Sequence, residues 1–330
     1  MLTVRKATAD DLEYIMRIYA QAREFMIRSG NPTQWGKTNP PRGLIEEDIR
    51  GGISRVICDG EAVRGVFALL TEEDPTYKQI EDGSWLNDSP YVTIHRIASD
   101  GVSRGIFRCA AGYCKSISRS VRVDTHADNA PMRRRIEENG FARCGIIHIA
   151  DGSPRIAYQW IAPQGGFEPV FESERMLFVR PSETLIADYI LLMNDFENVG
   201  RFIRSGPPAQ SARYDETHEL AWVRKTREEN AQAFSLIEKS SGDFIGNIEL
   251  MGVTGAQAEL GIALTAKKQN AGFGTEAVSA LTAYGFGTLG LERIFLRTNP
   301  KNARAICVYT KCGFREYDRR DGHVYMELFK

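Results

Sequence analysis

The sequence predicts an α+β protein built from two tandem copies of one domain, each a mixed, largely antiparallel sheet flanked by helices. Three observations lead to this prediction. At 330 residues the chain is longer than a single core usually grows. The segment Ala162–Glu174 is rich in Pro and Gly and divides the chain nearly in half. The two halves also share an internal repeat. We therefore expect domains at residues 1–162 and 173–330, joined by a linker over 163–172.

The repeat is visible in one ungapped alignment. The segment Val123–Phe141, "VDTHADNAPMRRRIEENGF", lies over Leu296–Phe314, "LRTNPKNARAICVYTKCGF". The identical residues, each pair 173 positions apart, are Thr125 and Thr298, Asn129 and Asn302, Ala130 and Ala303, Gly140 and Gly313, and Phe141 and Phe314. Each half also opens with a strand pattern followed by residues that favour a helix start, at Thr8–Asp11 and at Ser182–Glu183.

In the second half, apolar or alternating runs predict an antiparallel meander, with strands at Ala233–Glu238, Phe244–Met251 and Glu259–Thr265. A glycine-containing stretch and an amphipathic helix follow, with Ala277, Val278, Leu281 and Tyr284 at helical spacing. The strand Arg293–Thr298 comes next, and then a helix for which Asn302 is a plausible N-cap.

Composition and charge exclude several classes of protein. The hydrophobic fraction of 42% and charged fraction of 26% are ordinary for a globular chain, and a formal net charge of −1 does not favour a nucleic-acid partner. The densest basic run, Arg133–Arg135, reads as a solvated helix face. Neither a signal peptide nor a membrane-spanning run is recognisable, so we expect a cytoplasmic protein with no membrane partner.

Cysteine spacing argues against a metal centre. The six cysteines include no C-x-x-C pair, so neither a zinc site nor a disulfide framework is predicted. We expect reduced cysteines in the core and no metal.

The stretch Gln269–Ala277, "QNAGFGTEA", places two glycines ahead of a helical pattern. Gly272 and Gly274 lack a Cβ, so the backbone there can adopt positive φ and approach a phosphate closely. The helix that follows directs unpaired N–H groups and the positive end of its dipole at the same point. Lys267 and Lys268 could add positive charge. Taken alone, such a pair of glycines is also compatible with a simple turn.

Two motifs together point to a family. The spacing Gln269-x-x-Gly272-x-Gly274 and the later N-x-x-A-x-x-x-Y-x-K-x-G-F pattern at Asn302–Phe314 resemble the GNAT superfamily of acetyl-CoA-dependent N-acetyltransferases. The resemblance covers nearly all of Glu172–Lys330. Within the superfamily it is strongest to the branch that includes the ribosomal-protein alanine N-acetyltransferases.

The first half is similar to another GNAT branch, through Tyr91–Ser99, Val121–Met132 and Gly140–Gln159. Its pyrophosphate loop, "SDGVSRGIF", departs from the family pattern. We place Ser103 at the first family glycine and Gly105 at the second, which predicts a degenerate loop.

The resemblance implies that acetyl-CoA is the cofactor and that the second half holds it. The expected contacts are the backbone near Ile262–Leu264, which would polarise the thioester carbonyl, and the phosphate loop. Asn302 is either an N-cap or a contact to the pantetheine arm. The implied cofactor residues are Ile262, Leu264, Gln269, Asn270, Ala271, Gly272, Phe273, Gly274, Thr275 and Asn302, with Ser103 and Gly105 in the first half.

Acetyl transfer needs a base for the amine and a group that stabilises the leaving thiolate. Glu259 and Glu249 are the candidate bases, and the alternative for both is a solvated strand face. Tyr309 matches the family tyrosine that hydrogen-bonds the departing sulfur, and the alternative is a core tyrosine. Subtracting the repeat offset from Tyr309 gives Ile136, which has no proton to offer.

The first half therefore binds acyl-CoA weakly, uses another proton donor such as His95 or His126, or has a structural or acceptor-shaping role. The acceptor is expected to approach over Arg28–Trp35, Asp74–Trp85 and Arg204–Glu216. Aromatic and charged residues in these segments fit a peptide terminus, a polyamine or a small amine equally well.

The sequence thus predicts an N-acetyltransferase that acetylates a primary amine on a protein N-terminus or a small molecule, with its chemistry in the second half. A monomer and a homodimer are both compatible with it. The alternative is a non-catalytic acyl-CoA-binding or scaffold protein. A nucleotide-binding module is less favoured, because the glycine loop lacks the Lys-Ser/Thr of a P-loop.

Overall fold

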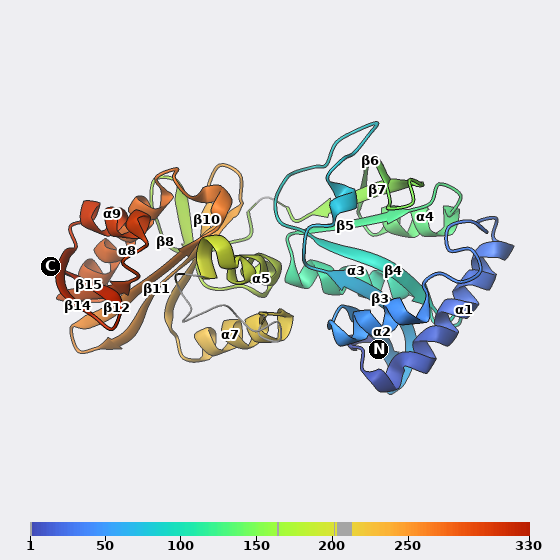
Figure 1. Ribbon diagram of the computed structural model, residues 1–330, viewed down its shortest axis with the longest axis horizontal. Coiled ribbons are helices and arrows are strands. Elements are labelled where there is room, and N and C mark those ends of the chain that lie inside the picture. Colours follow the sequence, from blue (N-terminus) through green and yellow to red (C-terminus); the bar gives the residue numbers. More distant parts are fainter. Residues whose placement is uncertain (1, 164, 201, 203–212) are drawn as a thin grey trace. The chain divides into compact units, whose positions relative to one another are not determined.

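The structure, a computed structural model, describes residues 2–163, 165–200, 202 and 213–330. The chain divides into two compact units, Met1–Ala162 and Pro163–Lys330. Each unit has its own mixed sheet with flanking helices (Figure 1), of seven strands in the first unit and eight in the second. The predicted α+β class is confirmed.

The first unit has four helices and seven strands within the described residues. Its strand order is β1-β2-β3-β4-β5-β7-β6, and β4 and β5 are its one parallel pair. The strands are β1 (Leu2–Lys6), β2 (Ser54–Asp59), β3 (Ala62–Leu70), β4 (Val92–Ser99), β5 (Ser120–Thr125), β6 (Ala142–His148) and β7 (Pro154–Ile161). The helices are α1 (Leu12–Arg28), α2 (Arg42–Arg50), α3 (Ile106–Ile117) and α4 (Ala130–Glu138).

The second unit follows the same plan, with the strand order β14-β15-β13-β12-β11-β10-β9-β8 and the parallel pair β12–β13. Its strands are β8 (Pro169–Glu172), β9 (Met176–Val179), β10 (Gln232–Glu238), β11 (Phe244–Thr254), β12 (Gln257–Leu264), β13 (Arg293–Thr298), β14 (Arg315–Arg320) and β15 (His323–Phe329). Its helices include α5 (Ile186–Asn194), α7 (Glu216–Glu228), α8 (Phe273–Gly287) and α9 (Ala303–Lys311).

Without β8, the two sheets have the same strand order and place their parallel pair at the same position. The aligned repeat corresponds to β5 with α4 and to β13 with α9. The caps of these helices also agree, because Asn129 accepts from Met132 N at 3.2 Å and Asn302 accepts from Ala305 N at 3.3 Å. The predicted N-cap role of Asn302 is therefore confirmed.

The expected linker is shorter than 163–172, because Pro169–Glu172 forms the edge strand β8. The Phe171 ring stacks on Phe178 at 4.2 Å and on Tyr284 at 4.4 Å, measured between ring centroids. An aromatic side chain in a Pro- and Gly-rich segment has found apolar partners in the sheet and in α8, which local composition did not reveal.

The predicted meander is present, with changed ends. β11 extends to Thr254 and β12 starts at Gln257, so the hairpin between them is longer than the apolar runs suggested. Thr265 lies outside β12. The predicted strand Arg293–Thr298 is confirmed at both ends.

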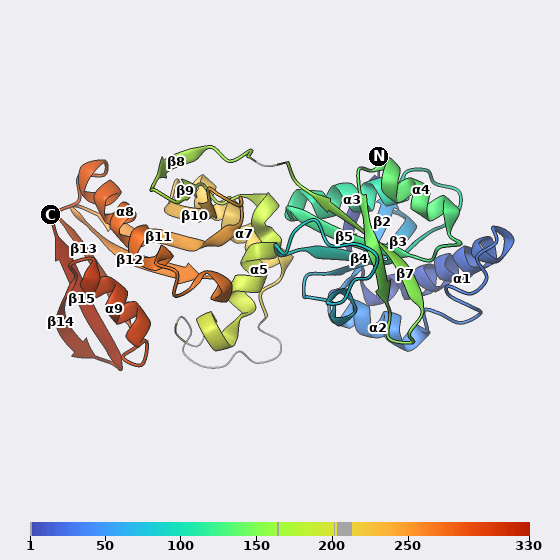
Figure 2. The same ribbon diagram turned by 90° about the horizontal axis from the view of Figure 1, so that it is seen from above.

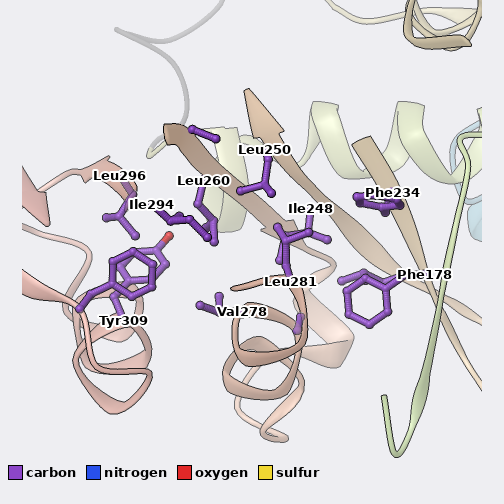
Figure 3. Close-up of a cluster of buried hydrophobic side chains, with 14 of the residues drawn as sticks. Phe178, Phe234, Ile248, Leu250, Leu260, Val278, Leu281, Ile294, Leu296 and Tyr309 are labelled. Carbon is purple, nitrogen blue, oxygen red and sulfur yellow. The ribbon is translucent and has the colours of Figure 1, made fainter. Parts of the chain in front are cut away.

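The core of the second unit lies between the sheet and the helices α8 and α9. Figure 3 shows Ile248, Leu250 and Leu260 of the sheet facing Val278 and Leu281 of α8, and all five are buried. Because side chains alternate along a strand, the neighbouring positions on β11 and β12 face the opposite side of the sheet.

Helix α5 packs on that opposite side. The Tyr189 hydroxyl of α5 lies 2.7 Å from Ser235 Oγ, and Ser235 Oγ donates to Asn247 Oδ1 at 3.0 Å. The sheet therefore separates a face with α8 and α9 from a face with α5. Figure 2 shows the same elements from above.

The predictions of a solvated basic helix face and of buried, reduced cysteines are confirmed in part. Arg134 and Arg135 are exposed on α4, and Arg134 pairs with Glu138 at 2.7 Å, as expected for a solvated face. The cysteines are free, but Cys307 is exposed, so the expectation that all six lie in the core is wrong. No described helix is both long and apolar enough to span a bilayer.

Candidate active site

The parallel strands of the second unit separate into a wedge. β12 and β13 pair at three positions only, from Gln257 with Arg293 to Glu259 with Phe295. Both strands continue beyond that point, β12 to Leu264 and β13 to Thr298. The backbone of Ile262–Leu264, the predicted carbonyl-polarising segment, lies on the part of β12 that has left its parallel partner.

Helix α8 begins beside this wedge with unpaired amide groups. Its N-cap, Gly272, has a φ of 83°, and Asn270 in the loop has a φ of 62°. Among the described residues, nothing accepts a hydrogen bond from the N–H groups of Phe273, Gly274 and Thr275. Such a helix N-terminus offers donors and a positive dipole end to an anion.

The two glycines have different structural roles. Gly272 has a left-handed backbone, whereas Gly274 lies in the first turn of α8 without a positive φ, so the predicted positive φ is confirmed for Gly272 and wrong for Gly274. A Cβ at Gly274 would lie 3.5 Å from Leu264 Cδ1 and 3.6 Å from Val308 Cγ2. Its bare backbone keeps the first turn of α8 open between the end of β12 and α9.

Gln269 ties the loop to the sheet. Its Nε2 donates to Leu264 O at 2.9 Å, so the loop is fixed to the last residue of β12. A side-chain amide at this position therefore sets how close the α8 N-terminus lies to the wedge.

A guanidinium beside the loop belongs to a residue that sequence analysis missed. Lys268 pairs with Glu238 at 2.6 Å and with Asp243 at 3.1 Å, so its charge is already neutralised. Arg175, which follows β8, instead donates to Ala271 O at 3.0 Å.

Arg175 also approaches the N-cap of α8. A Cβ on Gly272 would lie 3.2 Å from its Nη2, while its Nε pairs with Glu276 at 2.7 Å. No local motif marks Arg175, because it lies nearly a hundred residues before the loop in the chain.

Tyr309 projects from α9 into the core with its hydroxyl directed at the strands. Figure 3 shows the oxygen pointing toward Leu260 and Ile294. The side chain is buried at 6% exposure, and no described residue hydrogen-bonds the hydroxyl. Burial raises the pKa of Tyr309 to about 12, so the phenol remains protonated at neutral pH.

The two candidate carboxylates lie on the other face of the sheet. Glu249 is opposite Gly261 in the β11–β12 ladder, and a Cβ on Gly261 would lie 3.4 Å from Glu249 Oε1. Burial, with a smaller contribution from Glu259, raises the pKa of Glu249. Glu259 is held by Arg297, whose Nε lies 3.3 Å from Oε1. Glu249 is therefore the carboxylate better prepared to accept a proton.

The first unit opens in the same way. β4 and β5 pair from Val92 with Val121 to Ile94 with Val123, and then both strands continue unpaired with each other. Helix α3 starts beside this wedge, and its N-cap Gly105 has a φ of 83°, the same as Gly272.

This match changes the alignment of the two loops. Gly105 takes the place of Gly272, and Ser103 that of Asn270, so our placement of both residues was shifted by two positions. Phe107, which is buried, stands where the second unit has Gly274. The shift arose because the positive φ that identifies Gly105 as the counterpart of Gly272 is not visible in the sequence.

An internal carboxylate covers the first-unit loop. Asp100 Oδ1 accepts from the N–H groups of Val102 at 3.0 Å and Ser103 at 2.9 Å. When the N-caps Gly105 and Gly272 are aligned, the residue of the second unit that corresponds to Asp100 is Lys267. The first loop thus has an aspartate, paired with Arg64 at 3.4 Å, where the second has a lysine.

A cavity of about 230 Å³ lies at the wedge of the first unit. Its lining includes Ile94–Ile97 of β4 and Val123–Thr125 of β5. Of the two histidines that we considered, His95 lines this cavity and His126 does not.

His95 is held among acidic and aromatic side chains. Its Nε2 lies 2.9 Å from Asp74 Oδ2 and its Nδ1 lies 3.7 Å from Asp124 Oδ1. The Tyr77 ring stacks on the imidazole, and its hydroxyl donates to Asp124 at 2.7 Å. The hydrogen bond from His95 lowers the pKa of Asp74.

One of the three expected acceptor segments lines this cavity, and a second contacts His95 in its wall. Gln34 and Trp35 come from Arg28–Trp35, while Asp74 and Tyr77 in Asp74–Trp85 surround His95. Most of the third segment, Arg204–Glu216, lies outside the described residues.

Comparisons with known proteins agree with the resemblance in the sequence. The family model of the acetyltransferase (GNAT) domain matches residues 175–315. Spermidine N(1)-acetyltransferase of Vibrio cholerae is 30% identical over 118 residues, which are 35% of this chain and 65% of that protein. The uncharacterized N-acetyltransferase YnaD of Bacillus subtilis is 30% identical over 119 residues, 36% of this chain and 66% of that protein.

Two solved structures are also similar. A GNAT-family acetyltransferase of Streptococcus agalactiae is 28% identical with a TM-score of 0.45, and the match covers 49% of this chain and 96% of that one. Spermidine N-acetyltransferase of Vibrio cholerae in complex with CoA and spermine is 19% identical with a TM-score of 0.40, covering 47% and 95%. The chain spans slightly less than two thirds of the length of each of these two curated relatives.

Proposed function

We propose that this protein transfers an acetyl group from acetyl-CoA to a primary amine, with the chemistry in the second unit, where the family model of the acetyltransferase (GNAT) domain matches residues 175–315. The observation that carries the proposal is the wedge between β12 and β13. Helix α8 begins beside it with unpaired amides, on the face where the Tyr309 hydroxyl points toward Leu260 and Ile294, and Glu249 lies on the other face of the sheet.

The donor side of the site is the face with α8 and α9. The N–H groups of Phe273–Thr275 and the guanidinium of Arg175 suit the diphosphate of coenzyme A. The bound thioester supplies the activated acetyl group. The separated backbone of β12 offers donors that no parallel strand uses, and these suit the carbonyl oxygen of that group.

The acceptor side is the face with Glu249 and Glu259. An amine that arrives as an ammonium ion is attracted by the two carboxylates and must lose a proton before it attacks. A carboxylate with a raised pKa is a stronger base than an ordinary glutamate, so Glu249 suits this step better than Glu259.

Tyr309 serves the leaving group. With its pKa raised to about 12, it is a weaker acid than a thiol, whose ordinary pKa is about 8.5, so full proton transfer from Tyr309 is uphill. The phenol therefore stabilises the departing thiolate by a hydrogen bond, and the proton that finally neutralises the thiolate comes from the attacking amine.

The carboxylate pair on the acceptor face favours small cationic amines over neutral acceptors. The name of one relative, spermidine N(1)-acetyltransferase, is consistent with this class. We propose a primary amine of a polyamine or another small molecule as the acceptor, and a protein N-terminus as the second candidate.

The direct test is release of free thiol from acetyl-CoA, followed by mass spectrometry of the acceptor. The panel contains spermidine, short monoamines, and peptides with a free N-terminus. We expect a mass gain of one acetyl group on at least one small amine. If acetyl-CoA binds but no acceptor in the panel promotes thiol release, the non-catalytic alternative replaces this proposal.

A further inference from the structure

We propose that the cavity of the first unit binds a small molecule that carries both an amino group and a carboxylate, such as a free amino acid. This inference does not depend on acetyl transfer in the second unit. It rests on the charged and polar groups that line the cavity at the β4–β5 wedge.

The carboxylate end is assigned to Arg155 of β7. This arginine is 6% exposed and lines the cavity. Its Nη1 donates to Ser153 Oγ at 3.0 Å and to Pro154 O at 2.9 Å, while no described residue hydrogen-bonds its Nη2 or Nε. Within the described ranges, no carboxylate lies at ion-pair distance from it.

A buried guanidinium without a counterion is unusual, because burial of an unpaired charge costs free energy. Two unused donors on one planar group match the geometry of a carboxylate. The ligand would supply the missing negative charge.

The Thr125 hydroxyl is a second unused group. The residue is 1% exposed and lines the same cavity, and its Oγ1 has no hydrogen-bond partner among the described residues. Thr125 pairs with Ile156 in the β5–β7 ladder, one residue from Arg155. Both residues therefore lie at the same end of the wedge, with the Thr125 side chain on the opposite face of the sheet from that of Arg155.

The ammonium end is assigned to Asp124 and His95. The Tyr77 hydroxyl occupies Asp124 Oδ1, and no described residue bonds Oδ2. Asp74 accepts a hydrogen bond from Nε2 of His95, which in the neutral ring leaves the lone pair on Nδ1 beside Asp124. A carboxylate oxygen and an imidazole nitrogen thus remain available to an ammonium group.

The spacing and the charge balance favour a ligand with both groups. Asp124 pairs with Ala157, so Asp124 and Arg155 are diagonal neighbours on one face, with Cα atoms about 7–8 Å apart. Arg96, which also lines the cavity, is neutralised by Asp48 at 2.7 Å. The lining thus presents one unpaired cation and one available anion, which matches a zwitterion.

The size of the cavity limits the ligand to a small metabolite. At about 230 Å³ it is smaller than the pockets of about 300–1,000 Å³ that bind drug-sized molecules. Exposed Asn39 and Pro41 belong to its lining, so a ligand can enter from solvent there.

The experiment is titration calorimetry on the full chain without acetyl-CoA, using the proteinogenic amino acids as probes. Propylamine and propionate provide matched probes with only one of the two groups. We expect at least one amino acid to bind with a Kd of about 1 mM or lower, equivalent to about 4 kcal/mol, and both single-group probes to bind at least tenfold more weakly.

Two variants test the assignments. Arg155→Gln should weaken amino-acid binding at least tenfold, while Arg155→Lys, which keeps the charge, should weaken it less. Asp124→Asn should weaken amino acids and propylamine but leave propionate unchanged. The control is Arg135→Gln, an exposed arginine on α4 of the same unit, which should bind as the unmodified chain does.

Several results would overturn the proposal. One is the absence of binding by every amino acid at about 10 mM, which would leave any affinity weaker than about 3 kcal/mol. Another is unchanged binding in Arg155→Gln or Asp124→Asn with a normal circular dichroism spectrum. If Arg155→Gln fails to fold, the Asp124→Asn and Arg155→Lys results decide instead. Failure of acetyl transfer in the second unit changes none of these results.

Discussion

At the wedge of the first unit the ionisable side chain is His95, which comes from β4. At the wedge of the second unit it is Glu249, which comes from β11. Gly65 pairs with Ser99 and Gly246 with Leu264 at corresponding points of the two sheets. Three residues further along β3 and β11 lie Ala68, opposite His95, and Glu249, opposite Gly261. Each unit therefore places a small residue opposite its titratable group.

This exchange has a physical reason. Residues directly opposite in an antiparallel pair have Cβ atoms about 5 Å apart, so one large polar side chain fills the space of both. Either strand can supply that side chain if its partner is Gly or Ala. One topology thus supports a carboxylate site and a histidine site at the same location.

The loops differ in charge as well. Asp100 of the first unit bonds two loop amides, whereas the second unit has Lys267 at that position and Arg175 beside its N-cap. Arg108 also approaches the N-cap of the first unit, since a Cβ on Gly105 would lie 3.6 Å from its Nη2, so the occupied amides distinguish the first loop more than its charge does. We propose the first wedge as a site for a small zwitterion and the second as a site for a diphosphate. Five substitutions test this contrast.

The largest expected effect is that of Glu249→Gln, which should reduce kcat by about 100-fold, because general-base catalysis is lost. In the unmodified chain, turnover should fall as the pH drops through the raised pKa of Glu249, and the variant should lose this acid limb. The measurement is kcat against pH. Glu259→Gln is the control, with a smaller effect expected.

The same variant should be more stable at neutral pH. A raised carboxylate pKa means that the charged form is penalised in the folded state, so Glu249 costs stability above that pKa and costs none below about pH 4. Thermal unfolding should show a higher Tm for Glu249→Gln at neutral pH and no difference in acid. A lower Tm at neutral pH would contradict the assigned cause of the shift.

Tyr309→Phe is expected to reduce kcat about 10- to 100-fold, since a hydrogen bond to a charged group contributes about 1.5–3 kcal/mol. The affinity for acetyl-CoA should stay the same. Tyr284→Phe, on α8, is the matched control and should keep full turnover. Unchanged kcat in Tyr309→Phe would assign that residue to the core alone.

Gly272→Ala and Gly105→Ala form a matched pair. Both introduce a Cβ at a φ of 83°, where an L-residue is strained by about 1–2 kcal/mol, so both should lower Tm. We expect only Gly272→Ala to raise the Kd of acetyl-CoA, by about tenfold. An equal loss of affinity in Gly105→Ala would show that the first unit also binds the cofactor.

The smallest effect is expected for Gly274→Ala. Gly274 has no positive φ and an added Cβ meets only ordinary contacts, so the helix should gain about 0.5–1 kcal/mol. Denaturant unfolding measures this gain. A large loss of stability would mean that the first turn of α8 is packed more tightly than the distances to Leu264 and Val308 indicate.

Local signals in the sequence predicted much of the fold and part of the site. The strand Arg293–Thr298, the cap at Asn302 and the helix start after Gly272 were all recognisable, because caps, turns and periodicity act over a few neighbouring residues. The loop of the first unit was misaligned at Ser103 and Gly105, because the N-cap glycine is identified by the φ of 83° that Gly105 shares with Gly272 and not by a pattern in the sequence.

By itself the sequence determined the two α+β units, the repeated strand and helix, and the loop whose amides face the wedge. Only the tertiary structure decided that Arg175 reaches this loop, that Asp100 covers the other one, and that His95 and Glu249 stand at the same point of two sheets. These contacts and positions depend on the strand register and on which distant side chains share a face of the sheet. A short stretch of sequence determines neither of them.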